Sequence, residues 1–205
     1  IFQSFFSIFL MAPDLIFSKG GYGSLGPVIS GWILGVPIFL HESDISPGLA
    51  NRFLSKFTVE IFTSFPKTEY FSPKKMILVG NPIRRELLEV SKEEALEFFK
   101  ISKEKPVILI LGGSQGAQKI NEIVLLTLPE ILKDFELIHQ SGSRNFKEIK
   151  TETKAILPPD LEKYYHLYPF FQERELKLAY AISDFIVARA GSGTIFEIAA
   201  LGKPS

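Results

Sequence analysis

The chain has 205 residues, of which 46% are hydrophobic and 22% charged, a balance typical of a globular protein and not of a disordered one. Its formal net charge is +0, which gives no bulk attraction to nucleic acid, so we expect no nucleic-acid partner. The absence of cysteine excludes disulfides and thiol chemistry and fits a reducing compartment. The three histidines, His41, His139 and His166, are too scattered to predict a metal site.

The first twelve residues are strongly apolar and follow helical spacing, with aromatic side chains that include Phe5 and Phe9. The run is too short to span a bilayer, and it lacks the basic flank of a signal peptide. We therefore expect a helix, for which two interpretations stay open. It packs on the protein core, or its surplus aromatic side chains touch a membrane surface.

Residues 13–84 alternate short apolar runs with amphipathic segments, which predicts a mostly parallel sheet with helices on both faces. Strands are expected at residues 14–18, 36–40, 59–62 and 76–79, and helices at residues 28–34 and 47–57. Polar or glycine-rich clusters follow three of these strands, at residues 20–23, 41–44 and 80–84. Because ligands collect beyond the carboxyl ends of parallel strands, these clusters indicate a binding edge.

Three residues within 1–84 are candidates for a catalytic or binding role, and each also has a plainer structural interpretation. His41 directly follows a buried strand and is the best histidine for a general base, although such a residue more often holds loop backbone. Asp44 could accept hydrogen bonds from sugar hydroxyls, or cap the helix that is expected to begin at Pro47. Arg84 could clamp a phosphate, or be a surface charge beside Arg85.

Residues 85–105 break the strand rhythm, so we expect them to link two domains, 1–84 and 106–205. Within them, Ser91 and Glu94 have the spacing of a capping box at the start of a helix. In the second domain, strands are expected at Val107–Leu111 and at residues 135–139, 164–169 and 184–188, and helices at residues 117–128, 144–154, 173–181 and 194–201. This alternation again predicts a parallel sheet.

A glycine-rich turn joins the apolar strand Val107–Leu111 to the helix after it, and it contains Gly112, Gly113, Ser114 and Gly116. Glycines let the backbone turn sharply and approach a ligand. The free N–H groups and the positive dipole end of the new helix favour an anion, and a phosphate is the natural guest. The alternative is a plain strand-to-helix turn.

A similar turn precedes the last helix. Ser192, Gly193 and Thr194 lie at its start, where backbone N–H groups and hydroxyls can bind phosphate. Glu197 lies one turn later and could accept hydrogen bonds from both hydroxyls of a ribose, or merely complement the helix dipole. Together with Ser114, this pattern suggests a bound nucleotide diphosphate, although its spacing departs from G-x-G-x-x-G.

Six motifs occur in order along the chain: GGYGSLGP, LGVPIFLHESDISPGLANRFL, GNPIR, LGGSQGAQKIN, HQSG and RAGSGTIFEIAALGKP. Each is weak alone, but together they closely resemble the MurG family, the bacterial peripheral glycosyltransferases of peptidoglycan synthesis. The resemblance implies an α/β chain with the GT-B fold, two Rossmann-like domains with mostly parallel sheets, both incomplete here. It also implies transfer of N-acetylglucosamine from UDP-N-acetylglucosamine to lipid I, with inversion, to give lipid II.

The resemblance also implies roles for single residues. Ser114 would bind the donor diphosphate, Glu197 would hold the ribose, and Arg84 matches the arginine of the family's GNP-x-R motif and would also serve the donor. Asp44 stands where many members have asparagine and would face the donor sugar. The remaining assignments are Ser192, Gly193 and Thr194 along the diphosphate, Gly20, Gly21, Tyr22 and Gly23 at the acceptor, and Phe5, Phe9 and Trp32 toward the membrane.

The implied partners are UDP-N-acetylglucosamine, lipid I and the cytoplasmic membrane surface, with no cofactor and no metal, at the cytoplasmic face of the cell membrane. The family's first glycine loop, its sugar-recognition loop and its closing helix have no counterpart here. We therefore expect a fragment without transferase activity of its own, whose catalytic base stays unassigned. Two alternatives remain, a UDP-sugar epimerase of the GT-B type and a non-catalytic UDP-sugar-binding subunit.

Overall fold

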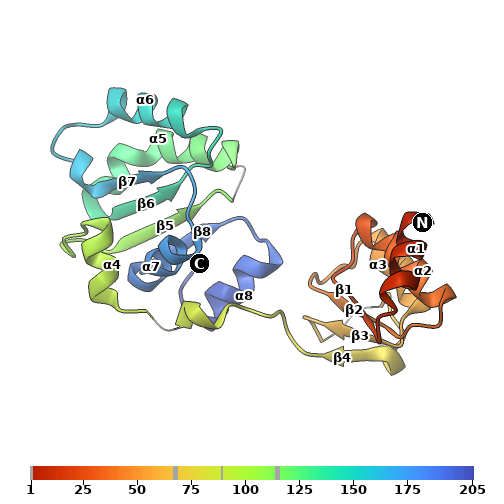
Figure 1. Cartoon of the computed structure of the whole chain (residues 1–205). Coiled ribbons are helices and arrows are strands. Elements are labelled where there is room, and N and C mark those ends of the chain that lie inside the picture. The colour runs from red at the N-terminus through yellow and green to blue at the C-terminus, as the bar shows by residue number, and fades with distance from the viewer. Residues whose placement is uncertain (1, 67–68, 89, 114–115) are drawn as a thin grey trace. The chain divides into compact units, whose positions relative to one another are not determined.

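The structure is a computed structural model that describes residues 2–66, 69–88, 90–113 and 116–205. The chain divides into two compact units, Ile1–Pro82 and Ile83–Ser205, close to the boundary expected at Arg84. Each unit contains a four-stranded sheet whose paired strands all run parallel, with helices packed on it (Figure 1). The predicted α/β class with two Rossmann-like parts is therefore confirmed.

The first unit has its strands in sequence order across the sheet, β1 (Ile16–Ser18), β2 (Ile38–Glu42), β3 (Glu60–Thr63) and β4 (Met76–Leu78). Its helices are α1 (Phe2–Met11), α2 (Leu25–Ile33) and α3 (Leu49–Leu54), with single 3-10 turns at Tyr22–Ser24, Ser55–Phe57 and Pro73–Lys75. Val28 of α2 and Leu54 of α3 pack with Ile38 of β2 in one buried cluster. Both helices cover the same face, because right-handed crossovers that advance in one direction stay on one side.

The opposite face of this first sheet carries a row of aromatic side chains. The rings of Phe39 and Phe62 stack with centroids 5.9 Å apart, and those of Phe17 and Phe62 with centroids 6.3 Å apart. Side chains alternate between the two faces of a strand, which places these rings opposite the face that holds Ile38. Phe17 remains exposed.

The second unit has the strand order β7-β6-β5-β8. Its strands are β5 (Val107–Leu111), β6 (Glu136–Gln140), β7 (Tyr165–Tyr168) and β8 (Phe185–Ala188), and its helices are α4 (Lys92–Phe99), α5 (Gln118–Asp134), α6 (Phe146–Ile156), α7 (Glu173–Ile182) and α8 (Ser192–Ala200). The chain moves outward from β5 to β7 and then returns to the other side of β5. This reversal creates a switch point between β5 and β8, where open α/β sheets bind ligands.

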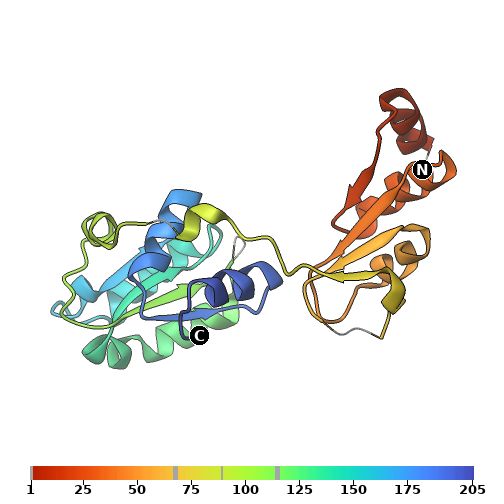
Figure 2. The same ribbon diagram turned by 90° about the horizontal axis from the view of Figure 1, so that it is seen from below.

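Helices cover both faces of the second sheet (Figure 2). On one face, Leu109 and Leu111 of β5 pack with side chains of α4, α7 and α8, including Phe99, Leu178 and Ile198. On the other face, Ile110 packs with Val124, Leu128 and Leu132 of α5. Burial on both faces explains why the sequence of β5 is an unbroken apolar run.

Residues 85–105, which were expected to be a linker, are folded into the second unit. They form a 3-10 turn, Arg85–Leu88, and helix α4. Leu87, Ala95 and Phe99 are buried in the same core cluster as β5. The predicted start of α4 is confirmed, because the Ser91 hydroxyl accepts a hydrogen bond from the Glu94 backbone N–H at 3.3 Å.

Helix α5 continues past the end expected at residue 128 and runs through Pro129 to Asp134. Proline within a helix costs one backbone hydrogen bond and crowds the preceding turn. The continuation nevertheless buries Leu132 completely beside Leu128. Burial of a leucine side chain contributes about 1.5–3 kcal/mol, which offsets much of that cost.

Candidate functional site

A cavity of about 950 Å³ lies within the second unit, at the carboxyl edge of its sheet. Leu111 ends β5, Gln140 ends β6 and Ala188 ends β8, and all three line the cavity. The remaining wall comes from the loop after β7, from α7 and from the start of α8. The cavity therefore opens at the switch point between β5 and β8, and its volume is in the range of small-molecule and cofactor sites.

Two glycine-rich turns border this cavity. Gly113, in the turn after β5, has a φ of +81° and lines it, as do Gly191, Gly193 and Thr194 at the start of α8. A Cβ on Gly112 would come within 2.8 Å of the Gln140 carbonyl oxygen, so this turn requires glycine. Ser114 lies outside the described residues.

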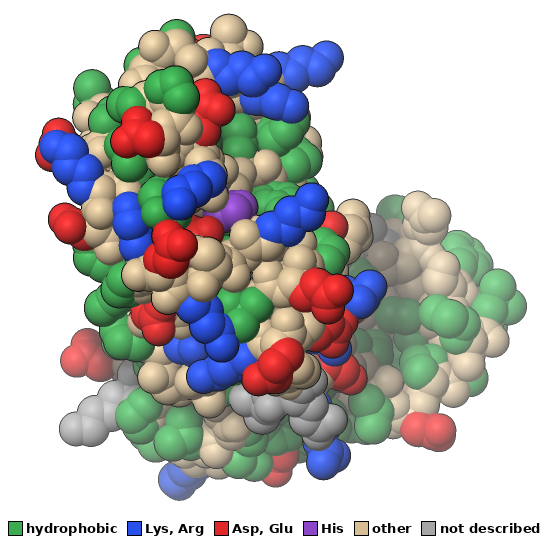
Figure 3. Space-filling view, turned by 90° about the vertical axis from the view of Figure 1, so that its left-hand side faces the viewer, with side chains coloured by type: hydrophobic (Ala, Val, Ile, Leu, Met, Phe, Trp, Pro, Cys, Tyr) green, Lys and Arg blue, Asp and Glu red, His purple; other side chains and the backbone are tan. Residues whose placement is uncertain are grey.

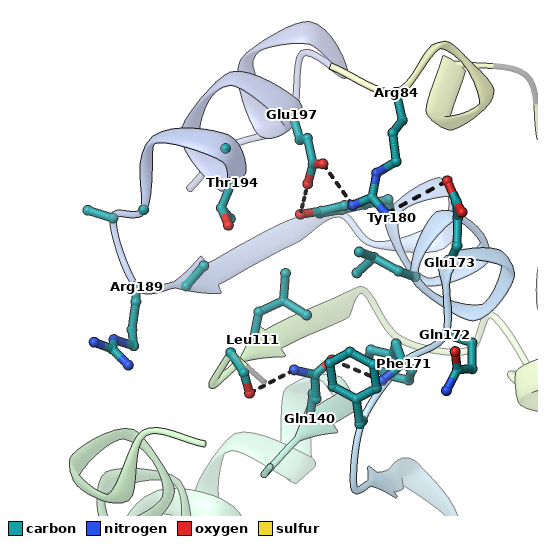
Figure 4. Close-up of a pocket in the computed structure, with 17 residues that line it drawn as sticks. Arg84, Leu111, Gln140, Phe171, Gln172, Glu173, Tyr180, Arg189, Thr194 and Glu197 are labelled. Atoms are coloured by element: carbon teal, nitrogen blue, oxygen red, sulfur yellow. Dashed lines mark hydrogen bonds and ion pairs between the residues drawn. The ribbon is translucent and has the colours of Figure 1, made fainter. Parts of the chain in front are cut away.

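Helix α8 begins with its backbone N–H groups available to a ligand. Its N-cap is Gly191, and among the described residues no side chain caps the helix start. Thr194 lies at the wall of the cavity (Figure 4), whereas Ser192, the first helical residue, is not among the residues that line it. Free N–H groups at a helix start and a threonine hydroxyl can bind a phosphate.

Glu197 projects from α8 and is held at both carboxylate oxygens. Arg84 donates to Oε1 at 3.0 Å, and the Tyr180 hydroxyl donates to Oε2 at 3.1 Å (Figure 4). A second ion pair joins Arg84 to Glu173 of α7 at 3.8 Å. The hydrogen bond to Glu197 raises the pKa of Arg84, while burial, reinforced by the charge of Glu197, raises the pKa of Tyr180.

Gln140 ties the two sides of the cavity together. Its Nε2 donates to the Gly113 carbonyl at 3.1 Å, and its Oε1 accepts a hydrogen bond from the Phe171 backbone N–H at 3.1 Å. The turn after β5 is thus fixed to the loop after β7. The sequence offered one signal for this residue, a polar HQSG stretch at a strand end, but not the two backbone groups that it bridges.

The structure therefore brings together Arg84, Gly193, Thr194 and Glu197, four of the seven predicted donor-binding residues, around one cavity. Tyr180 joins them although sequence reasoning missed it. In the sequence it is one aromatic residue on an amphipathic helix, which is indistinguishable from a core residue. Its hydroxyl gains a role only because α7 and α8 contribute to the same core cluster on one face of the sheet, which brings Tyr180 to Glu197.

His41 in the first unit has both ring nitrogens engaged. Its Nε2 lies 3.0 Å from the Gly80 carbonyl oxygen, which can only accept, so Nε2 carries the proton. Its Nδ1 then accepts a hydrogen bond from Lys19 Nζ at 2.8 Å, and Ser43 Oγ lies 3.3 Å away. The side chain is 2% exposed. This geometry favours the loop-holding interpretation of His41 over the general-base interpretation.

The predicted acceptor turn comprises Gly20, Gly21, Tyr22 and Gly23. The buried carboxylate of Glu42 fixes this turn through Asn51. Glu42 accepts a hydrogen bond from Asn51 Nδ2 at 2.7 Å, and Asn51 Oδ1 accepts one from the Gly21 N–H at 3.1 Å. The other oxygen of Glu42 accepts the Asp44 N–H at 2.9 Å. Glu42 thereby orders two loops of this edge, and sequence reasoning had not singled out Asn51.

Asp44 is exposed at the same edge of the first unit. The alternative interpretation, that Asp44 caps the following helix, is wrong. Helix α3 begins at Leu49, and its N-cap is Gly48. The carboxylate of Asp44 therefore does not cap helix α3.

The three residues expected to face a membrane differ in exposure. Phe9 of α1 is 62% exposed and Trp32 of α2 is 55% exposed, whereas Phe5 is half-buried with its ring edge-on to Phe6. Helices α1 and α2 pack side by side, and α1 has no charged side chain in its first or last turn. In the part of the chain that the structure describes, no helix is both long enough and apolar enough to cross a bilayer.

On the face of the second unit seen in Figure 3, basic and acidic side chains are interspersed. Within residues 2–66, 69–88, 90–113 and 116–205, no group of three or more histidine, aspartate or glutamate side chains is arranged to hold a metal ion.

Comparison with known proteins gives two family matches. Residues 107–205 match the glycosyltransferase family 28 C-terminal domain, and residues 1–63 match the glycosyltransferase family 28 N-terminal domain. Among solved structures, Acinetobacter baumannii MurG superposes with a TM-score of 0.71 at 25% identity, over 98% of this chain and 54% of that one. A UDP-N-acetylglucosamine 2-epimerase from Neisseria meningitidis, bound to UDP-N-acetylglucosamine, shares the fold with a TM-score of 0.68 at 18% identity, over 98% and 60%.

Curated relatives are similar along the whole chain. A protein of Bacillus cereus (strain ATCC 10987) is 41% identical over all 205 residues of this chain and 55% of its own length. Its name is UDP-N-acetylglucosamine–N-acetylmuramyl-(pentapeptide) pyrophosphoryl-undecaprenol N-acetylglucosamine transferase 2. A transferase of the same kind from Treponema pallidum (strain Nichols) is 36% identical over 98% of this chain and 53% of its own length. The chain thus spans about half the length of the curated relatives it matches.

Proposed function

We propose, for a chain that belongs to the MurG group of glycosyltransferase family 28, that the protein transfers N-acetylglucosamine from UDP-N-acetylglucosamine to lipid I. The single observation that carries the proposal is the cavity of the second unit, where phosphate-binding turns and a fixed carboxylate converge. The two groups fit the diphosphate and the ribose of one nucleotide.

The donor would bind with its diphosphate at the start of α8, near Gly193 and Thr194, and its ribose at Glu197. In the transfer, a base takes the proton of the acceptor hydroxyl, whose oxygen forms a bond to the anomeric carbon while the bond from that carbon to the UDP oxygen breaks, so UDP leaves and the configuration inverts. Backbone N–H groups stabilise the charge that develops on the leaving UDP. Ser114 would add a hydroxyl donor to the diphosphate.

The first unit would serve the acceptor. Its turn at Gly20, Gly21, Tyr22 and Gly23 would face the diphosphate of lipid I, and the Glu42–Asn51 pair holds that turn in shape through the Gly21 N–H. Nothing in this unit assigns the catalytic base, and His41 is engaged elsewhere.

The exposed apolar side chains of α1 and α2 support contact with the cytoplasmic membrane surface. Phe6, Phe9 and Trp32 are all more than half exposed, and aromatic residues on such a helix face insert into the boundary between headgroups and acyl chains. The double substitution Phe6→Ser and Phe9→Ser should weaken binding to anionic lipid vesicles by at least about fivefold. Leu126→Ser, an exposed apolar position on α5, is the matched control, and equal losses in both variants would contradict membrane contact through α1.

The donor site is tested by calorimetry with UDP and UDP-N-acetylglucosamine. Glu197→Ala removes the acceptor of the ribose hydroxyls and should weaken binding by about 1.5–3 kcal/mol, as expected for hydrogen bonds to a charged group. Glu130→Ala, at an exposed carboxylate that pairs with Lys133, should leave the affinity unchanged. An unchanged affinity in Glu197→Ala would remove Glu197 from the site.

The relatives also favour a transferase over an epimerase. The epimerases share the fold at low identity, whereas the curated transferases are 36–41% identical over essentially the whole chain. Incubation of the full-length protein with UDP-N-acetylglucosamine and a lipid I analogue should give a glycosylated acceptor and UDP. Formation of an epimerised UDP-sugar instead would overturn the proposal.

A further inference from the structure

The carboxylate of Glu197 is fixed before any ligand arrives. Each of its oxygens already accepts one hydrogen bond, from Arg84 at 3.0 Å and from the Tyr180 hydroxyl at 3.1 Å (Figure 4). An ionised carboxylate offers about four acceptor positions, so about two remain for a ligand. A pair of neighbouring hydroxyls on a sugar is the kind of donor that two fixed acceptor positions recognise.

The two partners of Glu197 differ in how firmly they hold it. Arg84 has a long side chain that is 42% exposed, and it is shared between Glu197 and Glu173. Tyr180 belongs to α7 and is only 1% exposed. Its side chain is one of the largest that are fully buried, and it packs in the core cluster of the second unit. Its hydroxyl is therefore a donor at a fixed point in the cavity wall, and Arg84 supplies charge more than rigidity.

We infer that Tyr180 is a positioning residue that orients Glu197 toward the 2′ and 3′ hydroxyls of the bound nucleotide and so makes the cavity selective for ribose over deoxyribose. This inference rests on the proposed donor site. Tyr180 itself does not touch the reacting atoms. A hydroxyl is suited to this task because it adds a hydrogen bond without adding a charge, so the carboxylate keeps its full negative charge for the ligand.

The test compares UDP with 2′,3′-dideoxy-UDP, which lacks both ribose hydroxyls. Calorimetry on the wild-type protein should show a clear preference for UDP. Tyr180→Phe should weaken UDP binding about three- to tenfold, because one hydrogen bond orienting the carboxylate is lost, and should change binding of the dideoxy nucleotide less than about twofold. Tyr168→Phe is the matched control, since this tyrosine packs on Phe99 and Phe171 in the same core, and it should leave the preference intact.

Each remaining outcome has a defined meaning. Failure of the wild-type protein to bind UDP would contradict the proposed donor site. Binding of UDP without preference over the dideoxy nucleotide, or a preference that survives Tyr180→Phe, would overturn the role of Tyr180 and leave the donor site standing. Partial unfolding of the variant lowers the binding stoichiometry and not the affinity of the folded fraction, so calorimetry separates the two effects.

A second variant covers the case in which Tyr180→Phe does not fold. Glu197→Asp leaves the buried tyrosine in place but retracts the carboxylate by one methylene group, away from the Tyr180 hydroxyl. The preference for UDP should again fall about three- to tenfold. Full retention of the preference in Glu197→Asp would show that the position of the carboxylate does not matter, and would overturn the inference.

Discussion

Buried polar side chains at the carboxyl edges of both sheets act mainly on other side chains or on the backbone. Tyr180 orients Glu197, Gln140 joins two loops, and Glu42 orders a glycine turn through Asn51. Such groups are costly to bury unless every hydrogen bond is made. Their presence at these two edges indicates that loop geometry there is held by specific side-chain contacts.

The buried histidine His139 should make the free energy of unfolding depend on pH. His139 of β6 is fully buried, with Nε2 3.0 Å from Asn121 Oδ1 and Nδ1 2.8 Å from the Tyr165 hydroxyl. Burial lowers the pKa of His139 to about 4. The unfolded chain, where a histidine pKa is about 6.5, therefore takes up a proton first as the pH falls. The free energy of unfolding should decrease between about pH 6.5 and pH 4, by up to about 3 kcal/mol from this group.

Urea unfolding at several pH values checks this expectation. The substitution His139→Gln removes the titrating group. The unfolding free energy of the variant should therefore depend less steeply on pH across this window, and its slope should differ from that of the wild type by at most about 1.4 kcal/mol per pH unit. Above pH 7 the two proteins should show parallel pH dependence. Identical slopes from pH 6.5 to pH 4 would show that His139 is not the buried neutral group described.

At the scale of elements, the turn between β1 and α2 depends on one glycine. Gly20 has a φ of +85°, and a Cβ there would overlap the side chain of Asn51. Gly20→Ala should therefore destabilise the first unit by about 1–3 kcal/mol and disturb the Gly21 hydrogen bond to Asn51. Thermal or urea unfolding measures the loss.

The same turn supplies the control. Gly23 is not among the glycines with positive φ, and a Cβ there would meet nothing within 4 Å. Gly23→Ala should change the unfolding free energy by less than about 0.5 kcal/mol. If both alanine variants were equally destabilised, the conformation of Gly20 would not be the cause.

At the scale of the whole molecule, the candidate nucleotide cavity belongs to one unit. Every residue that lines it, from Arg84 to Glu197, falls within Ile83–Ser205, which has its own sheet and core. A chain of residues 83–205 should therefore fold and bind UDP with an affinity within about threefold of that of the 205-residue chain. Circular dichroism and calorimetry measure these properties, and folding without UDP binding would show that the first unit contributes to the nucleotide site.

The alternation of strands and helices could be predicted from the sequence, because apolar periodicity and glycine turns are local signals. The sequence also singled out Arg84, Gly193, Thr194 and Glu197 as residues of one donor site, and all four line the same cavity. It predicted the start of α4 at Ser91 but assigned this helix to a linker instead of the second core, and it ended α5 too early, where burial of Leu132 outweighed the signal of Pro129.

The contacts of each polar group, in contrast, follow from the three-dimensional fold. Tyr180 and Glu197 are seventeen positions apart on different helices, and Gln140 reaches backbone groups of two distant loops. Such pairings arise from how helices cross a sheet, and no residue spacing within one segment encodes them. The same reason separates the two interpretations of His41, whose neighbours Lys19 and Gly80 come from other strand ends and leave it no free nitrogen.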